Sequence, residues 1–118
     1  EITKHGGIAI CAPIAPYTEM RRAVRAMISE YGGFYEIYIS TPLEVCEARD
    51  RKGLYAKARA GIVKEFTGVS DPYEIPQHAE LVIDTQHMPA ADAVRLILER
   101  LQLDGYLPTS AEEMDYSI

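Results

Sequence analysis

Three short apolar runs, separated by segments of helix length, constrain the fold of this 118-residue chain more than any other feature. The runs occupy residues 8–12, 34–40 and 81–84, and their apolar and β-branched content is typical of strands in a buried sheet. Amphipathic helical patterns follow at residues 18–31 and 89–105. This alternation predicts an α/β fold with a parallel sheet, right-handed crossovers and helices on both faces. Three strands make only part of a doubly wound domain.

Two shorter helices are expected between the second and third strands. Residues 41–49 begin Thr-Pro-Leu-Glu, which is a capping box with threonine at the N-cap and proline at the first helical position. Thr18 is the corresponding N-cap expected for the helix of residues 18–31. Residues 54–60 form the second short helix, and residues 65–79 carry the glycine, proline, serine and aspartate residues of a loop.

The charge distribution is uneven. The net charge is −6, which argues against a nucleic-acid-binding domain, but residues 49–64 hold six basic side chains and one acidic one, or +5 against −11 elsewhere. Such a basic run forms either a solvated helix face or a patch for an anionic small molecule, and charge alone leaves both open. Because no apolar run approaches ~20 residues and the first 20 residues do not resemble a signal peptide, we expect a cytoplasmic protein that does not enter a membrane.

Cysteine and histidine residues are too few and too scattered to form stabilising disulfides or a metal site. Cys11 and Cys46 lie far apart in the chain, and the three histidines are scattered, so neither a disulfide framework nor a metal site is expected. Each cysteine sits in an apolar stretch and is expected to be a small buried side chain.

Four motifs carry a specific resemblance. Residues 41–68 read TPLEVCEARDRKGLYAKARAGIVKEFTG, and they are flanked by IAICAPIAPY at 8–17, SDPYEIP at 70–76 and LVIDT at 81–85. In this order and spacing the chain resembles the C-terminal half of adenylylsulfate (APS) kinases. Those enzymes transfer the γ-phosphate of ATP to the 3′-hydroxyl of APS in sulfate assimilation, giving PAPS and ADP. The resemblance implies a P-loop nucleoside-triphosphate hydrolase-like fold over residues 1–107, followed by a C-terminal tail at 108–118.

The phosphate-binding loop of that family, G-x-x-x-x-G-K-[ST], occurs nowhere in the 118 residues. In the family this loop, the Mg²⁺ ligands and the acidic catalytic residue lie upstream of the matched motifs. The resemblance therefore implies half of a kinase domain that is inactive alone and leaves a sheet edge or an apolar face exposed. Its expected partners are the missing half, ATP with Mg²⁺, APS, a fused ATP sulfurylase in the manner of some bacterial members, and a second copy in a homo-oligomer.

The resemblance also assigns roles within the chain. Residues 49–64 would be a basic lid and residues 65–79 an APS-binding loop. Arg49 would stack on the adenine of ATP, with Thr85 and Met88 beside it. Neither a catalytic residue nor a metal ligand is expected in this segment. The residues implied to bind APS are Ile14, Ala15, Lys52, Glu65 and Phe66.

Several assignments keep an alternative. Phe66 is either a stacking surface for the APS adenine or a loop anchor packed under the lid. Lys57, Arg59 and Lys64 either contact nucleotide or form a solvated helix face. Asp84 is expected to cap a turn rather than to act as a catalytic acid.

Ala15 stands where many family members have serine, so either phosphate passes directly in line from ATP to APS or this activity is absent. For the whole chain, the alternative to a kinase half is a catalytically inactive APS-kinase-like module that binds nucleotide and regulates an attached ATP sulfurylase.

Overall fold

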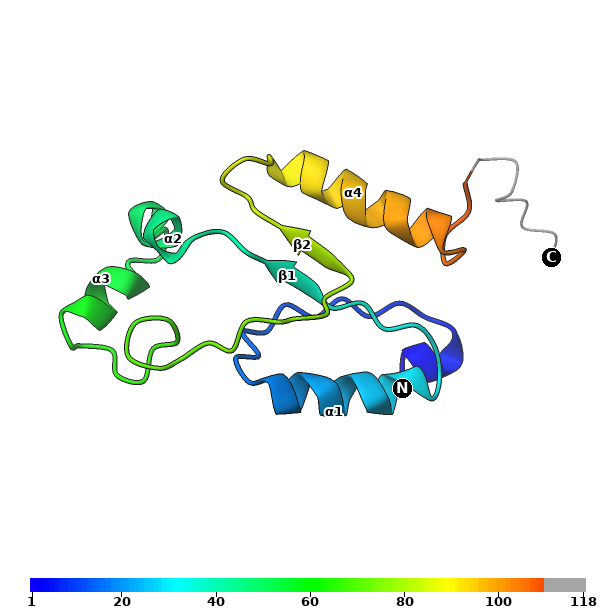
Figure 1. Cartoon of the computed structure of the whole chain (residues 1–118), viewed down its shortest axis with the longest axis horizontal. Helices are drawn as coiled ribbons and strands as arrows, with labels where there is room; N and C mark the ends of the chain where they lie inside the picture. Colours follow the sequence, from blue (N-terminus) through cyan, green and yellow to red (C-terminus); the bar gives the residue numbers. More distant parts are fainter. Residues whose placement is uncertain (110–118) are drawn as a thin grey trace.

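The computed structural model describes residues 1–109, arranged around a two-stranded parallel sheet (Figure 1). Strands β1 and β2 pair in the register Ile37 with Leu81 and Ile39 with Ile83. Helices α1 and α4 lie on opposite sides of the strands, and α2 and α3 lie beyond their carboxyl ends (Figure 1). The elements are η1 (Thr3–His5), α1 (Thr18–Ser29), β1 (Ile37–Ile39), α2 (Leu43–Arg49), α3 (Leu54–Arg59), β2 (Leu81–Ile83) and α4 (Ala90–Leu103).

The α/β class and the parallel sheet are confirmed, but the first expected strand is wrong. Residues 8–12 form no strand, and within residues 1–109 the sheet consists of β1 and β2 alone. Ile10 is 93% exposed, and Cys11, expected to be buried, is exposed as well. An extended segment becomes a strand only when a neighbour accepts and donates its ladder hydrogen bonds, and residues 8–12 lack such a neighbour in the described part of the chain.

Both predicted N-caps are also wrong. Tyr17 is the N-cap of α1, and the amide of Thr18 donates to Glu74 Oε1 at 3.0 Å. Pro42 is the N-cap of α2, without a side-chain capping hydrogen bond. The Thr41 hydroxyl instead hydrogen-bonds the Thr85 hydroxyl at 2.6 Å. Glu74, far along the chain, thus makes the hydrogen bond to α1 that a local cap would otherwise make, whereas the Thr41 hydroxyl bonds Thr85 and does not cap α2.

Helix α1 turns its cationic face, not its apolar face, toward the strands. Arg25 pairs with both carboxylate oxygens of Glu80, at the start of β2, and its guanidinium lies 4.8 Å from the centre of the Phe34 ring. Burial would raise the pKa of Glu80, but the hydrogen bonds from Arg25 and from the Glu36 amide outweigh it, and the pKa lies below its ordinary value. Large apolar side chains of α1 stay exposed on the other side: Met20, Val24 and Met27.

The buried core is correspondingly small. Only Ala58, Ile83 and Ala93 are buried apolar residues among those described, and one of them, Ile83, lies in β2. The expected exposed apolar surface is therefore present on α1 and along residues 8–14. Within residues 1–109, no helix has both the length and the hydropathy to cross a membrane. The tail predicted at residues 108–118 lies outside the described residues except for 108 and 109.

Candidate functional site

A cavity of about 330 Å³ opens where α2, α3 and the loop after α3 meet, beyond the carboxyl end of β1. Ligands of parallel α/β sheets bind at this end of the strands. Three cations and one carboxylate line the cavity, so its charge is positive. Its polar and aromatic lining includes Arg49, Asp50, Arg51, Lys52, Tyr55 and Phe66.

A tight turn at residues 50–53 separates α2 from α3 and carries Lys52. Asp50 Oδ1 accepts the Tyr55 amide and Oδ2 accepts the Ala56 amide, both at 3.0 Å, so this carboxylate caps α3. Gly53 adopts φ +65°, the left-handed conformation that glycine enters without a steric penalty. Asp50 therefore fixes the turn that carries Lys52. The role of Asp50 is not predictable from a capping pattern, because Gly53 is the N-cap of α3 and Asp50 directly follows α2.

Phe66 lines the cavity from the loop side. Its ring lies edge-on to the Tyr55 ring, with centroids 5.1 Å apart and planes at 72°. The Phe66 amide donates to Ser70 Oγ at 2.6 Å, and the Phe66 carbonyl accepts the Ser70 amide at 2.9 Å, so a tight turn fixes the backbone here. Phe66 thus lines the cavity and packs as an anchor of the loop, whereas its stacking on the APS adenine stays a prediction. The sequence analysis missed Tyr55; burial is the main cause of the raised pKa of its phenol.

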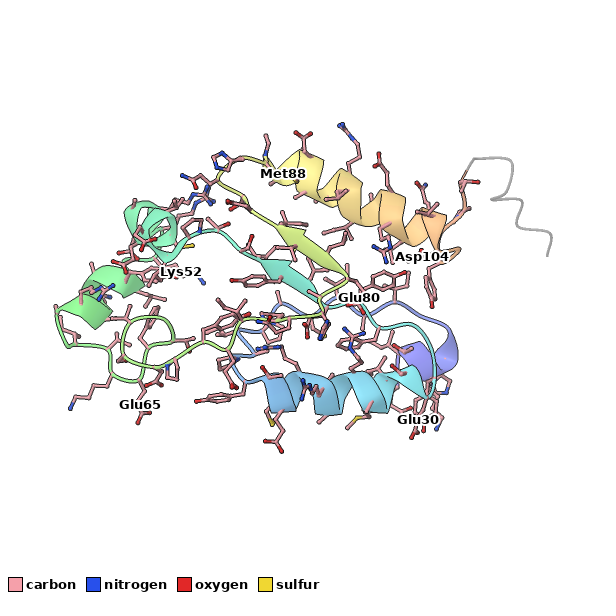
Figure 2. All side chains as sticks on the ribbon, viewed as in Figure 1. Glu30, Lys52, Glu65, Glu80, Met88 and Asp104 are labelled. Atoms are coloured by element: carbon pink, nitrogen blue, oxygen red, sulfur yellow. The ribbon has the colours of Figure 1, made fainter. Side chains whose placement is uncertain are left out.

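Arg49 is fixed by Thr85. Nη1 donates to Thr85 Oγ1 at 2.8 Å, and Nη2 donates to the Thr85 carbonyl at 3.1 Å. Thr85 is held in turn by Thr41, whose hydroxyl accepts the Thr85 amide at 3.0 Å. Arg49 and Thr85, both expected near the ATP adenine, therefore lie together. Met88 is half-buried at the start of α4 (Figure 2).

The remaining expected site residues do not line this cavity. Glu65 is exposed, with φ +52°, and lies on the loop well away from Lys52 (Figure 2). Ile14 is exposed, and Ala15 adopts φ +44° in a separate turn that precedes α1. The sequence-predicted residues that the structure brings together in the cavity are therefore Arg49, Lys52 and Phe66.

Arg59 and Asp84 each bond a neighbouring part of the fold. Arg59 forms an ion pair with Glu47 and so links α3 to α2, while Lys57 and Lys64 are exposed. Asp84 Oδ1 accepts the Gln86 amide at 2.8 Å, which is the predicted turn-capping role. In the described part of the chain, His, Cys, Asp and Glu side chains form no group of three or more that could hold a metal ion.

The chain is similar in sequence to proteins from several organisms and in structure to a solved kinase. It is 44% identical over 106 residues to the adenylyl-sulfate kinase of Synechococcus sp., covering 90% of this chain and 58% of that protein. It is 46% identical over 106 residues to the sulfate adenylyltransferase of Aspergillus oryzae, again over 90% of this chain but only 18% of that protein. The structure of the Mycobacterium tuberculosis APS kinase CysC in complex with AMPPNP and APS matches with a TM-score of 0.65 and 37% identity.

That structural match covers 77% of this chain and 52% of the mycobacterial chain. The chain thus spans about half to three fifths of the two kinases and about a fifth of the fungal protein. The family model for adenylylsulphate kinase matches residues 1–84, which include the turn before α1, the cavity residues and β2. With its parallel sheet, its cationic cavity and these matches, the chain belongs to the adenylylsulphate kinase family.

Proposed function

We propose that this chain is the lid and part of the APS pocket of a kinase that transfers the γ-phosphate of ATP to the 3′-hydroxyl of APS. The observation that carries the proposal is the convergence of Arg49, Lys52 and Phe66 on one positively charged cavity. Phosphoryl transfer depends on positioning the two substrates and on stabilising the charge of the transferred group. A cavity that combines cations with an aromatic ring suits two anionic adenine nucleotides.

Each cavity residue has a distinct role in this proposal. The Arg49 guanidinium, held in its plane by two hydrogen bonds to Thr85, offers its face to the adenine of ATP. Met88 contributes apolar contact to the same base. Lys52 contacts APS as a compact positive charge, and Phe66 stacks on the APS adenine.

The turn at Ile14 and Ala15 and the backbone at Glu65 complete the APS pocket in the proposal. Ala15 has no hydroxyl to phosphorylate, so transfer is direct. The 3′-oxygen of APS forms the new bond to the γ-phosphorus as the bond from that phosphorus to the β–γ bridging oxygen of ATP breaks. ADP leaves with that oxygen, and the proton of the 3′-hydroxyl passes to a base outside this chain.

The phosphate-binding loop, the catalytic base and the Mg²⁺ ligands come from residues outside these 118 in the proposal. One observation supports this: the chain has no G-x-x-x-x-G-K-[ST] motif. When bound with ATP, Mg²⁺ neutralises charge on the β- and γ-phosphates. We use "complete kinase" below for this chain joined to such a phosphate-loop half.

The experiment compares Phe66→Leu with wild type in the complete kinase, measuring KM for APS and for ATP during PAPS formation. The variant should raise KM for APS and leave KM for ATP unchanged. The matched control is Phe34→Leu, which changes the other phenylalanine of the chain, outside the cavity. An unchanged KM for APS in Phe66→Leu would remove Phe66 from the site.

A second candidate function is a regulatory module that binds nucleotide without transferring phosphate, attached to an ATP sulfurylase. Alanine at position 15, where many family members have serine, is the observation that favours it. The two functions differ in one result: a regulatory module binds APS and ATP but forms no PAPS, even when joined to a phosphate-loop half.

A further inference from the structure

The turn that precedes α1 has a strained backbone. Ala15 adopts φ +44°, in the left-handed region that non-glycine residues rarely enter. The next residue is Pro16, and a proline pushes the residue before it toward extended conformations. Such strain persists only where the surrounding structure holds it, and it is concentrated at ligand-binding sites. The structure must therefore contain a group that fixes this turn.

That group is Arg21, which lies in the first turns of α1 and has a side chain only 9% exposed. Nη1 donates to the Ala15 carbonyl at 2.7 Å, so the guanidinium holds the strained residue itself. Nη2 donates to Thr18 Oγ1 at 3.1 Å and to the Glu74 carbonyl at 2.6 Å. One planar cation thus bridges the turn to a loop 53 residues further along the chain.

The same turn and loop are joined by two further hydrogen bonds. The Glu74 amide donates to the Pro16 carbonyl at 2.9 Å, and Glu74 Oε1 accepts the Thr18 amide at 3.0 Å. Tyr73, the neighbour of Glu74, stacks on Tyr38 of β1 with centroids 6.1 Å apart. The Arg21 guanidinium lies 5.6 Å from the centre of the Tyr73 ring. The end of the loop is therefore anchored to the sheet as well as to the turn.

Glu36 completes the surroundings of Arg21. Its carboxylate Oε2 lies 3.6 Å from Arg21 Nε, and its side chain is 18% exposed. A largely buried guanidinium without a carboxylate would be costly, and this ion pair with Glu36, at the start of β1, offsets that cost. The arrangement joins three segments: the Ala15 turn, the 65–79 loop and the strand β1.

We propose that Arg21 is a positioning residue of the APS pocket, which holds the Ala15 turn and the 65–79 loop at a fixed distance. This inference rests on the proposed function, because that turn and that loop are the two segments assigned to APS. The role needs several donors in one plane, which a lysine ammonium does not provide. Arg21→Gln should therefore loosen the pocket for APS and leave the ATP side, near Arg49, unchanged.

Two measurements test the inference. Amide hydrogen exchange on the chain reports the hydrogen bonds of Thr18 and Glu74 without any substrate. Steady-state kinetics of the complete kinase reports KM for APS, KM for ATP and kcat. The variants are Arg21→Gln and Arg21→Lys, and the control is Arg22→Gln, which changes the exposed neighbour on the same helix.

The expected result is selective. In Arg21→Gln the Thr18 and Glu74 amides exchange faster than in wild type, while amides of α4 do not change. KM for APS rises about tenfold, as expected for lost hydrogen bonds to a charged group, with KM for ATP and kcat nearly unchanged. Arg21→Lys shows smaller changes in amide exchange and in KM for APS than Arg21→Gln does, and Arg22→Gln behaves as wild type.

Other results overturn the inference. An unchanged KM for APS in Arg21→Gln refutes the positioning role. Equal rises in both KM values, with faster exchange throughout the chain, show that Arg21 supports the whole fold and not one pocket. A wild-type complete kinase that makes no PAPS refutes the proposed function and the substrate part of the inference together. The exchange rates of Thr18 and Glu74 then still decide whether Arg21 clamps the turn.

Discussion

The substitution Arg49→Lys keeps the positive charge in the cavity but removes the planar guanidinium. Arg49 donates two hydrogen bonds to Thr85, and a lysine ammonium at this position can replace at most one of them. Loss of the stack on adenine costs about 0.5–1 kcal/mol at an exposed site, whereas the hydrogen bonds to Thr85 lie within the protein and form without ATP. That cost corresponds to a roughly 2- to 5-fold rise in the Kd for ATP.

Isothermal titration of the complete kinase with a non-hydrolysable ATP analogue, and separately with APS, measures this effect. Arg49→Lys should weaken binding of the ATP analogue by that factor and leave the Kd for APS unchanged. The control is Arg95→Lys, which makes the same exchange at an exposed position of α4. If Arg49→Lys binds the ATP analogue as tightly as wild type, the guanidinium plane has no part in ATP binding and its assignment is wrong.

Three further predictions concern other parts of the molecule. Thr85→Val removes the hydroxyl that accepts a hydrogen bond from Arg49 but keeps the Thr85 carbonyl, which accepts the other. In isothermal titration, this variant should therefore weaken binding of the ATP analogue less than Arg49→Lys does. A larger loss of affinity would contradict the geometry. Glu80→Gln should lower the free energy of unfolding, measured in urea titrations, by about 1–2 kcal/mol at pH 7. In the variant, this free energy should also fall less steeply as the pH is lowered. Because the folded pKa of Glu80 is lowered, the stability from its pairing with Arg25 is present above the ordinary pKa and is lost as pH falls through the folded pKa. The same loss of stability at low pH in Glu80→Gln and wild type would refute this. The hydrogen bond to Asp104 raises the pKa of Tyr35 to about 12. The stabilising effect of this bond is therefore present below pH 10 and is lost as pH rises toward 12. Ultraviolet titration of Asp104→Asn should show the Tyr35 pKa falling toward 10, and an unchanged pKa would exclude the bond.

The sequence predicted the elements whose pattern is local. Helices α1 and α4 were predicted from amphipathic periodicity, and β1 and β2 from short apolar runs, because those signals lie within the elements themselves. Residues 8–12 have an equally good strand pattern but no ladder partner in the described chain, and a strand cannot be read from one segment alone. The caps predicted at Thr18 and Thr41 failed because their hydroxyls bond other side chains, those of Arg21 and Thr85.

Site residues within one short motif were also easier to predict than those that depend on contacts between distant segments. Arg49, Lys52 and Phe66 line one cavity because they lie on α2, on the turn between α2 and α3, and on the loop after α3; their assigned roles toward ATP and APS stay predictions. The resemblance did not find Tyr55 or Arg21, whose importance lies in contacts with Phe66, Ala15 and Glu74 across the fold. Such long-range contacts leave no periodic or spacing signal in a single sequence.

Under the proposed function, this chain completes a kinase that acts on APS. The most direct measurement joins the chain to the upstream half of the 44% identical Synechococcus adenylyl-sulfate kinase and follows the radiolabelled γ-phosphate of ATP in the presence of APS. The expected result is labelled PAPS with an equal amount of ADP, no label trapped on the protein, and no product from the 118 residues alone. A folded hybrid that binds both nucleotides but forms no labelled PAPS would contradict it.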